Sequence, residues 1–233
     1  MALQTGRYLG ILDLEYGSPS GVTPPPQGSM MSSATFDLPV ISETVEGAWA
    51  DVVMRGDPAL EPAYVAATQR LVERGAVAIS SYCGAAIRHQ AALAAAVNVP
   101  VVTSSLLLVP MLLRQLPPRT KLGVITLDTR AFGEDLLRLS DPTERMRIVI
   151  GGLEGGKLVE NEAMCPPQPT DIADIETEIA ACVARLRAAN PEIAALLFSC
   201  TLFPPATPMI RRTTGLPVYD ITTICRMTLQ SIA

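Results

Sequence analysis

Two cysteines stand at matching points of two similar stretches of this chain. Cys83 is the next-to-last residue of the stretch 76–84 (AVAISSYCG), and Cys200 is the next-to-last residue of the stretch 193–201 (IAALLFSCT). Each cysteine is the eighth residue of its stretch, and an apolar-Pro-Val step follows each of them after the same interval. Each stretch resembles a buried parallel strand that leads into a loop. A chain that repeats a cysteine in this way is expected to use the two thiols together.

The chemistry open to such a pair is proton transfer at carbon. An ordinary cysteine has a pKa of about 8.5, so only a few per cent is thiolate at pH 7. The N–H groups at the start of a following helix would favour one thiolate, by up to ~2 kcal/mol. Two close thiolates repel each other, so we expect one base and one acid. Such a pair can take a proton from one face of a carbon and return it to the other, while N–H groups near Gly84, Ala85 and Thr201 hold a substrate carboxylate.

The elements that carry these residues alternate between strand and helix. Apolar runs predict strands over 7–14, 39–45, 76–83, 99–103, 121–127, 145–150, 193–200 and 217–219. Helical spacing predicts helices over 58–74, 85–97, 105–116, 131–139, 171–189, 203–214 and 222–232. This alternation predicts an α/β protein with parallel sheets and right-handed crossovers. Ligands of such sheets bind beyond the carboxyl ends of the strands, where both cysteines are expected.

The chain also repeats itself on a larger scale. The residues LGVI at 122–125 echo LGIL at 9–12, and Pro117-Pro118 marks a seam between the two halves. We therefore expect two similar lobes related by a pseudo-two-fold axis, each a short parallel sheet flanked by helices. Lobe 1 is assigned to 1–116 plus 217–233 and lobe 2 to 117–216, with the active site expected in the cleft between them.

Composition narrows the classes of partner. The 233 residues are 48% hydrophobic, carry a formal net charge of −5 and show no basic cluster, so neither nucleic acid nor membrane is expected as a partner. No apolar run reaches the ~18 residues of a membrane span, and the N-terminus lacks the order of a secretion signal. A cytoplasmic protein with five reduced cysteines is expected, and a homodimer is the default oligomer.

Several other signals have two readings. Asp13, Glu15 and Asp128 follow the leading strands and could orient a thiol or bind an amino group, although a solvated loop carboxylate is the simpler reading of each. His89, the only histidine, is expected to be capped or exposed on its helix, and a supporting role behind a catalytic residue is the less favoured reading. The Gly- and Pro-rich segment 15–38 is either a lid or a surface loop.

Two ligand classes are rejected from the sequence. The residues GGLEGGK at 151–157 have the spacing of a phosphate-binding loop, but Leu158 replaces the Ser or Thr that would hold magnesium, and Pro166-Pro167 cut the next helix short. We therefore expect a turn rather than a nucleotide site. One histidine and scattered cysteines match no metal-ligand spacing, so no metal is expected.

These residues resemble the aspartate/glutamate racemase superfamily over nearly the whole chain. The resemblance rests on LGIL early, LGVIT at 122–126, the two cysteines, Ser199-Cys200-Thr201 and the segment 215–220 (GLPVYD). Members include aspartate, glutamate and hydantoin racemases, maleate isomerase and arylmalonate decarboxylase. The resemblance implies catalysis without a cofactor, by Cys83 and Cys200.

The resemblance also implies substrate-binding residues. Thr126, Thr129 and Thr201 match threonines of the superfamily, whereas Gly84 and Ala85 replace the usual Asn-Thr and Leu202 replaces a usual Glu or His. The segment containing Glu15 and Tyr16 replaces the usual early loop, and both are candidates for substrate binding. These departures remove the groups that would recognise an α-amino group.

The function expected from the sequence is a cofactor-independent racemase or isomerase of a small carboxylate-bearing substrate, such as an amino acid. The first alternative is a lyase, decarboxylase or maleate-type cis–trans isomerase of the same superfamily, in which a cysteine serves as nucleophile or proton donor. The second is a non-catalytic binder of a small molecule, because a fold does not fix a function.

Overall fold

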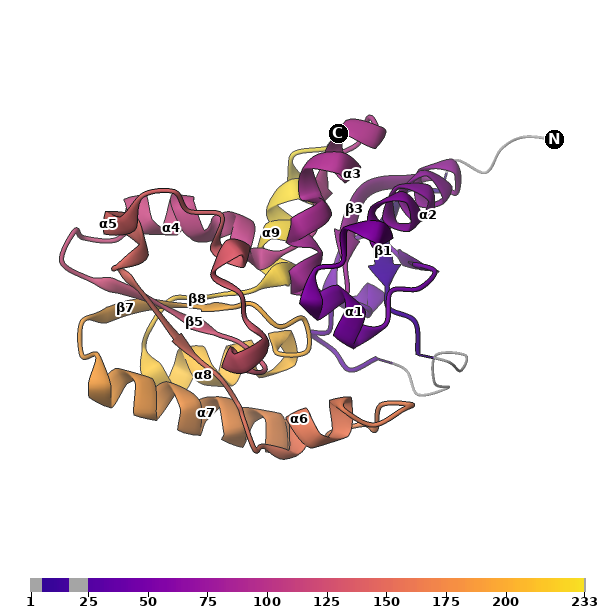
Figure 1. Ribbon diagram of the computed structural model, residues 1–233. Helices are drawn as coiled ribbons and strands as arrows, with labels where there is room; N and C mark the ends of the chain where they lie inside the picture. Colours follow the sequence, from indigo (N-terminus) through magenta and orange to yellow (C-terminus); the bar gives the residue numbers. More distant parts are fainter. Residues whose placement is uncertain (1–5, 17–24, 233) are drawn as a thin grey trace. The chain divides into compact units, whose positions relative to one another are not determined.

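The chain forms two compact units, and the computed structural model describes residues 6–16 and 25–232. Within that part of the chain, unit 1 comprises 6–15, 25–104 and 222–232, and unit 2 comprises 16 and 105–221. The lobes expected from the sequence divide at 116/117 and 216/217, whereas the compact units divide at 104/105 and 221/222. Each unit is α/β, with a four-stranded sheet flanked by helices (Figure 1).

The two sheets have the same topology. In unit 1 all neighbouring strands are parallel and the order is β2-β1-β3-β4; the strands are β1 (Tyr8–Asp13), β2 (Val40–Thr44), β3 (Ala76–Ser81) and β4 (Val101–Val102). In unit 2 the parallel order is β6-β5-β7-β8; the strands are β5 (Lys121–Ile125), β6 (Ile148–Gly151), β7 (Ile193–Phe198) and β8 (Val218–Tyr219). The internal repeat expected from the sequence is therefore present in the fold.

A glycine near the start of each leading strand has a packing reason. A Cβ added at Gly10 would come within 2.8 Å of Ile79 Cδ1, and one added at Gly123 within 2.9 Å of Leu196 Cδ2. These neighbours are the register partners of the two glycines on the adjacent strands. The repeated Leu-Gly pair is thus explained by the close packing of the next strand's side chains over the leading strand.

The helices cover the sheets, and in unit 2 they bury one contiguous core. Those of unit 1 are α1 (Ala50–Arg55), α2 (Glu61–Glu73) and α3 (Gln90–Ala96), together with nearly all of α9 (Ile221–Gln230). Those of unit 2 are α4 (Val109–Gln115), α5 (Pro142–Arg145), α6 (Lys157–Glu162), α7 (Ile172–Ala189) and α8 (Thr207–Thr214). In Figure 1, α7 and α8 lie on one face of the unit 2 sheet and α4 lies on the other. Apolar residues on one face of α7, among them the buried Ile179 and Val183, join those of β7 in the core of unit 2.

Short 3-10 helices replace several expected segments. The helix expected over 85–97 begins as the 3-10 helix η3 (Gly84–His89) before α3. The helix expected over 131–139 is wrong: η5 (Thr129–Ala131) and η6 (Glu134–Leu137) stand there, separated at Gly133. The remaining 3-10 helices are η1 (Ser33–Thr35), η2 (Pro58–Leu60), η4 (Ser105–Leu108) and η7 (Pro204–Ala206). Gly133 has extended backbone dihedrals, and this break in helical geometry separates η5 from η6.

The second half of the segment 15–38 is packed against unit 1. Met30 is fully buried, and Thr35 Oγ1 donates a hydrogen bond to the Ser29 carbonyl at 2.6 Å. Arg226 of α9 donates to the Thr35 carbonyl at 3.1 Å, with its guanidinium 5.9 Å from the centre of the Phe36 ring. Residues 25–38 are therefore an anchored part of the fold, while residues 17–24, the middle of the expected lid, lie outside the described residues.

Candidate active site

Cys83 lies at the carboxyl end of a central strand, as the sequence predicts. It follows β3 by two residues and immediately precedes η3. Its amide donates a hydrogen bond to the hydroxyl of Ser81 at 3.3 Å, and the amides of Ala85 and Ala86 hydrogen-bond its sulfur. Gly84 and Ala85, both expected at the substrate, thus lie in the turn that faces the thiol.

Burial governs the protonation of this thiol. It raises the pKa of Cys83 above its ordinary value, although the two amides and, more weakly, the Arg88 guanidinium act in the opposite direction. Cys83 is therefore a neutral thiol at neutral pH. The amides at the start of η3 favour the thiolate, in the direction expected from the sequence, but they do not offset the lost hydration.

Asp13 is a buried acid at the same sheet edge. Its side chain is 4% exposed, and Oδ1 accepts a hydrogen bond from the Leu14 amide at 2.8 Å. Burial raises the pKa of Asp13 to about 6, against the effect of that hydrogen bond. The Tyr82 amide donates to the Leu12 carbonyl, which brings the end of β1 beside the residue that precedes Cys83. The reading of Asp13 as a solvated loop carboxylate is therefore wrong.

His89 is also buried, at 4% exposure, which corrects the expectation of a capped or exposed histidine. Its ring stacks on Tyr64 of α2, with centroids 4.7 Å apart and planes at 24°. Burial lowers the pKa of His89, with Glu61 acting against this and Arg88 adding to it. Tyr64 lies in the helix expected over 58–74, whose apolar spacing gives no signal of this stacking.

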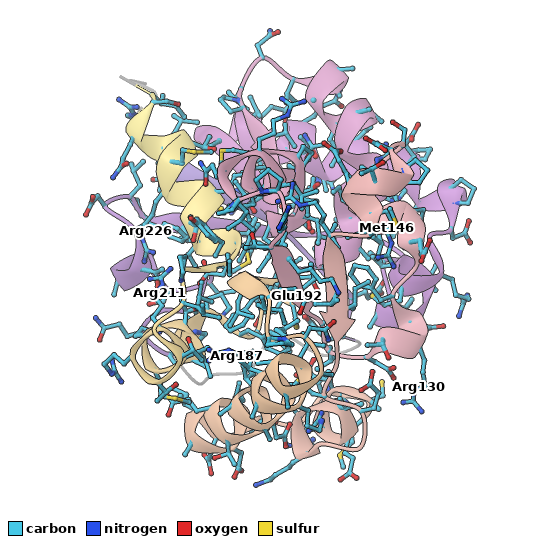
Figure 2. The ribbon with its side chains drawn as sticks, turned by 90° about the vertical axis from the view of Figure 1, so that its left-hand side faces the viewer. Arg130, Met146, Arg187, Glu192, Arg211 and Arg226 are labelled. Carbon is cyan, nitrogen blue, oxygen red and sulfur yellow. The ribbon has the colours of Figure 1, made fainter. Side chains whose placement is uncertain are left out.

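The other acidic candidates have structural partners. Glu15 accepts a hydrogen bond from the Gly47 amide at 2.7 Å and so holds the turn after β2. Asp128 caps η5 through the Arg130 amide and pairs with the Arg130 guanidinium, which lowers the pKa of Asp128. Arg130 points outward from the surface (Figure 2), while the Asp128 side chain is 20% exposed, so Asp128 is a half-buried loop carboxylate with a structural partner. Tyr16 is half-buried.

Unit 2 repeats the arrangement of the first cysteine. Cys200 follows β7 by two residues and is half-buried. The Ser199 amide donates to the Ile125 carbonyl at 2.9 Å, which ties the residue before Cys200 to the end of β5. Thr126 directly follows β5, and both Thr126 and Thr201 are buried. Cys200, Thr201 and Thr126 therefore share one sheet edge, as the sequence predicts.

Thr129 belongs to a different part of unit 2. Its amide donates to the Glu154 carboxylate, and both residues line a hollow of about 310 Å³ between β6 and α7. Cys182 and Arg185 of α7 also line this hollow, whereas Cys200, Thr201 and Thr126 do not. Thr129 thus lines this hollow, and the amide of Thr126 bonds the carbonyl of Gly151 at its edge.

The segment 151–157 is a capped turn and not a phosphate cradle. The Glu178 carboxylate accepts hydrogen bonds from the amides of Lys157 and Leu158, at 2.7 and 3.4 Å. A resident carboxylate thus occupies the N–H groups that a phosphate would need. The helix that follows, α6, has six residues, in agreement with the rejection of a nucleotide site.

Three further observations concern disulfides, groups of metal ligands and membrane-spanning helices. None of the five cysteines, all of which lie in the described residues, forms a disulfide. Within residues 6–16 and 25–232, His, Cys, Asp and Glu side chains nowhere gather in a group of three or more suited to a metal. No helix in that part of the chain is long and apolar enough to span a membrane.

Comparison with solved structures identifies the fold. A glycine-to-cysteine variant of arylmalonate decarboxylase, in its sulfate-associated form, matches with a TM-score of 0.60 and 20% identity over 96% of this chain and 92% of that one. A glutamate racemase from Bacillus anthracis and an allantoin racemase from Klebsiella pneumoniae each give a TM-score of 0.59, at 16% and 13% identity; they cover 98% and 97% of this chain and 82% and 86% of their own. The chain therefore has the two-lobed α/β fold that this decarboxylase and these racemases share.

The chain is also similar in sequence to curated proteins. A dimethylsulfoniopropionate lyase of Durusdinium sp. clade D is 29% identical over 206 residues, covering 84% of this chain and 67% of that protein. Dimethylsulfoniopropionate lyase 5 of Emiliania huxleyi (strain CCMP1516) is 28% identical over 171 residues, covering 68% of this chain but only 34% of its own length. The match thus spans from a third to two thirds of the length of these relatives. No protein-family profile matches the chain.

Proposed function

We propose that this chain is a lyase that removes a proton from the carbon beside a carboxylate and expels a leaving group from the next carbon. The observation that carries the proposal is the similarity to dimethylsulfoniopropionate lyases over 84% of the chain. The fold supports the same chemistry, since cofactor-independent racemisation and decarboxylation both pass through a carbanion beside a carboxylate. The proposal favours the lyase alternative over the racemase that the sequence predicts.

The substrate class follows from the reaction. In a β-sulfonio carboxylate such as dimethylsulfoniopropionate, a base takes a proton from the carbon beside the carboxylate. The electron pair left behind forms the carbon–carbon double bond, and the carbon–sulfur bond breaks with its electrons on sulfur. Acrylate and neutral dimethyl sulfide are released, with the proton on the base. One general base is enough for this reaction, because the leaving sulfide needs no proton.

The two cysteines are assigned different roles in this proposal. Burial keeps Cys83 protonated, so it serves as a hydrogen-bond donor to the substrate. Cys200, at the equivalent strand end of unit 2, is then the candidate base. Ala85 and Thr201 remain candidates to hold the carboxylate, and Asp13 is added as a buried acid beside the turn of Cys83.

The test is direct measurement of elimination. Purified protein is incubated with dimethylsulfoniopropionate, and dimethyl sulfide in the headspace and acrylate in solution are quantified together. We expect equal amounts of the two products, with the Cys165→Ser variant as active as wild type because Cys165 is exposed. The proposal fails if no acrylate forms while the protein is folded.

Racemisation is the second candidate, favoured by the presence of a cysteine at the same position of both units. It needs a thiol on each face of one carbon, whereas the elimination needs one base. An incubation in D₂O with amino acids, hydroxy acids and hydantoins separates the two functions. Deuterium at the carbon beside the carboxylate, with inversion and without loss of a group, would favour the racemase.

A further inference from the structure

A side-chain hydrogen bond closes the segment that follows each cysteine. In unit 2 the Thr207 hydroxyl donates to the Asp220 carboxylate at 2.6 Å, and both residues are buried. In unit 1 the side-chain oxygen of Gln90 accepts from the hydroxyl and the amide of Thr103, at 2.8 and 3.0 Å, while its nitrogen donates to the Val101 carbonyl at 2.9 Å. We call these two pairs the unit 2 brace and the unit 1 brace.

The two braces occupy equivalent positions. Gln90 and Thr207 are the first residues of α3 and α8, and each lies seven residues after the cysteine of its unit. Thr103 and Asp220 directly follow β4 and β8, and each lies twenty residues after that cysteine. The residue types differ between the units, but the link is made at the same point of both. This agreement indicates that both units need the link itself.

The turn between each cysteine and its brace is also built in the same way. The carbonyl of Cys83 accepts from the Ala86 amide at 3.0 Å, and that of Cys200 accepts from the Phe203 amide at 3.4 Å, three residues further on in both units. Each turn continues as a 3-10 helix, η3 or η7, that ends at the residue before the brace. Only the turn itself therefore lies along the chain between each cysteine and its brace.

The strand side of each turn is fixed as well. The Tyr82 amide donates to the Leu12 carbonyl at 2.8 Å, and the Ser199 amide donates to the Ile125 carbonyl at 2.9 Å. The residue before each cysteine is thus bonded to the leading strand of its unit, while the brace bonds the far end of the turn to the residue after β4 or β8. Each cysteine turn spans two neighbouring strand ends and is anchored at both.

We propose that the unit 2 brace positions Cys200 and that the unit 1 brace positions Cys83. A base must stay within hydrogen-bond reach of the proton that it removes, so a turn that is free to move at its far end should lower the rate of that step. In unit 1 the Arg88 guanidinium also holds the turn, through the carbonyls of Val53 and Met54, so the loss of that brace should have the smaller effect. The inference rests on the proposed function only in taking the two cysteines as reacting groups.

The test reads the reactivity of both thiols in one sample, without any substrate. Wild type and Thr207→Val are alkylated briefly with iodoacetamide at a fixed pH, and the modified fractions of Cys83 and Cys200 are read from their peptides by mass spectrometry. Valine has the shape of threonine without its hydroxyl, so the turn of Cys200 should open more easily. We expect Cys200 to react about tenfold faster, as for the loss of one hydrogen bond of usual strength, and Cys83 to react as in wild type. An unchanged Cys200, or an equal acceleration of both thiols, would overturn the proposal.

Two further variants control this result. Thr207→Ser keeps the hydroxyl and should restore the wild-type reactivity of Cys200; a rate as high as that of Thr207→Val would assign the effect to packing and overturn the proposal. Gln90→Met removes the unit 1 brace and should accelerate Cys83 alone. If Thr207→Val does not fold, this reciprocal variant provides the test, and an unchanged Cys83 would overturn the proposal. Where elimination is observed, Thr207→Val should lower kcat with little change in KM. The absence of lyase activity would leave every alkylation measurement interpretable.

Discussion

The hydroxyl of Ser81 accepts a hydrogen bond from the Cys83 amide at 3.3 Å, so the backbone that carries the sulfur is tied to the strand it leaves. Ser81 in turn bonds the Leu12 carbonyl of β1, which links the turn to the neighbouring strand. None of these bonds uses the sulfur. The amides of Ala85 and Ala86, which do bond the sulfur, can bond a serine hydroxyl in its place, so replacing Cys83 by serine should change the chemistry of the turn and leave its backbone in place.

The cysteine variants should separate a lyase from a racemase. For elimination we expect Cys200→Ser to lower kcat about 10²–10⁴-fold, the usual cost of losing a general base, and Cys83→Ser to lower it by about tenfold or less. For racemisation both variants would lose activity to a similar, large extent. The measurement is dimethyl sulfide release and deuterium exchange for each variant, with Cys165→Ser as the control at an exposed cysteine. Full elimination activity in both variants would contradict the assignment of the pair.

Cys83 should stay protonated to unusually high pH. Burial raises its pKa above the ordinary value, so a reaction that needs the neutral thiol should keep its rate beyond the pH at which an ordinary cysteine ionises. The dependence of kcat/KM on pH reports the free enzyme, so its alkaline limb is the quantity to measure. A limb that falls at neutral pH in wild type and disappears in Cys83→Ser would show that the thiol is acidic and would contradict this prediction.

The sequence predicts the framework well because the framework is written in periodic patterns. Apolar runs and the repeated Leu-Gly pair predict both parallel sheets, and the two cysteines are found two residues beyond equivalent strands. Helix α7 agrees with its expected range to within a residue because its apolar spacing is regular over five turns. The segment 131–139 was harder, since Gly133 interrupts a pattern that spacing alone does not distinguish from a helix.

The electrostatics of the candidate site did not follow from the sequence. Whether Asp13 is solvated or buried depends on how the end of β1 is covered, which its neighbours in sequence do not reveal. The pKa of Cys83 is a balance between burial and two amides, and the sequence shows only that a turn follows.

The ionised carboxylate of Asp13 should lower the free energy of unfolding at neutral pH. Its folded-state pKa of about 6 lies above the ordinary 3.8, so the native state loses stability as pH rises from about 4 to 6 and carries the full cost above that. Two pKa units correspond to about 3 kcal/mol. Asp13→Asn keeps the acceptor for the Leu14 amide and removes the ionisation, so it should raise the free energy of unfolding at pH 7 by up to about 3 kcal/mol.

The check is urea denaturation of both proteins at pH 7 and near pH 4. Near pH 4 the native carboxyl is neutral, so most of the gain should disappear. A gain of equal size at both values would mean that packing and not ionisation is responsible. A stabilised but less active variant would indicate that the buried acid is retained for the reaction.

The carboxylate of Glu178 should stabilise the start of α6. It accepts hydrogen bonds from the amides of Lys157 and Leu158 and lies where the helix dipole favours negative charge. We expect Glu178→Ala to lower the free energy of unfolding by about 1 kcal/mol, the usual cost of a lost N-terminal cap. Glu176→Ala, on the same helix, is the matched control and should change stability by less than about half of that, as is usual at a surface position. Equal losses in the two variants would assign the effect to α7 itself.

ATP and inorganic phosphate should leave the thermal midpoint of Glu178→Ala unchanged, because Leu158 lacks a hydroxyl and α6 is only six residues long.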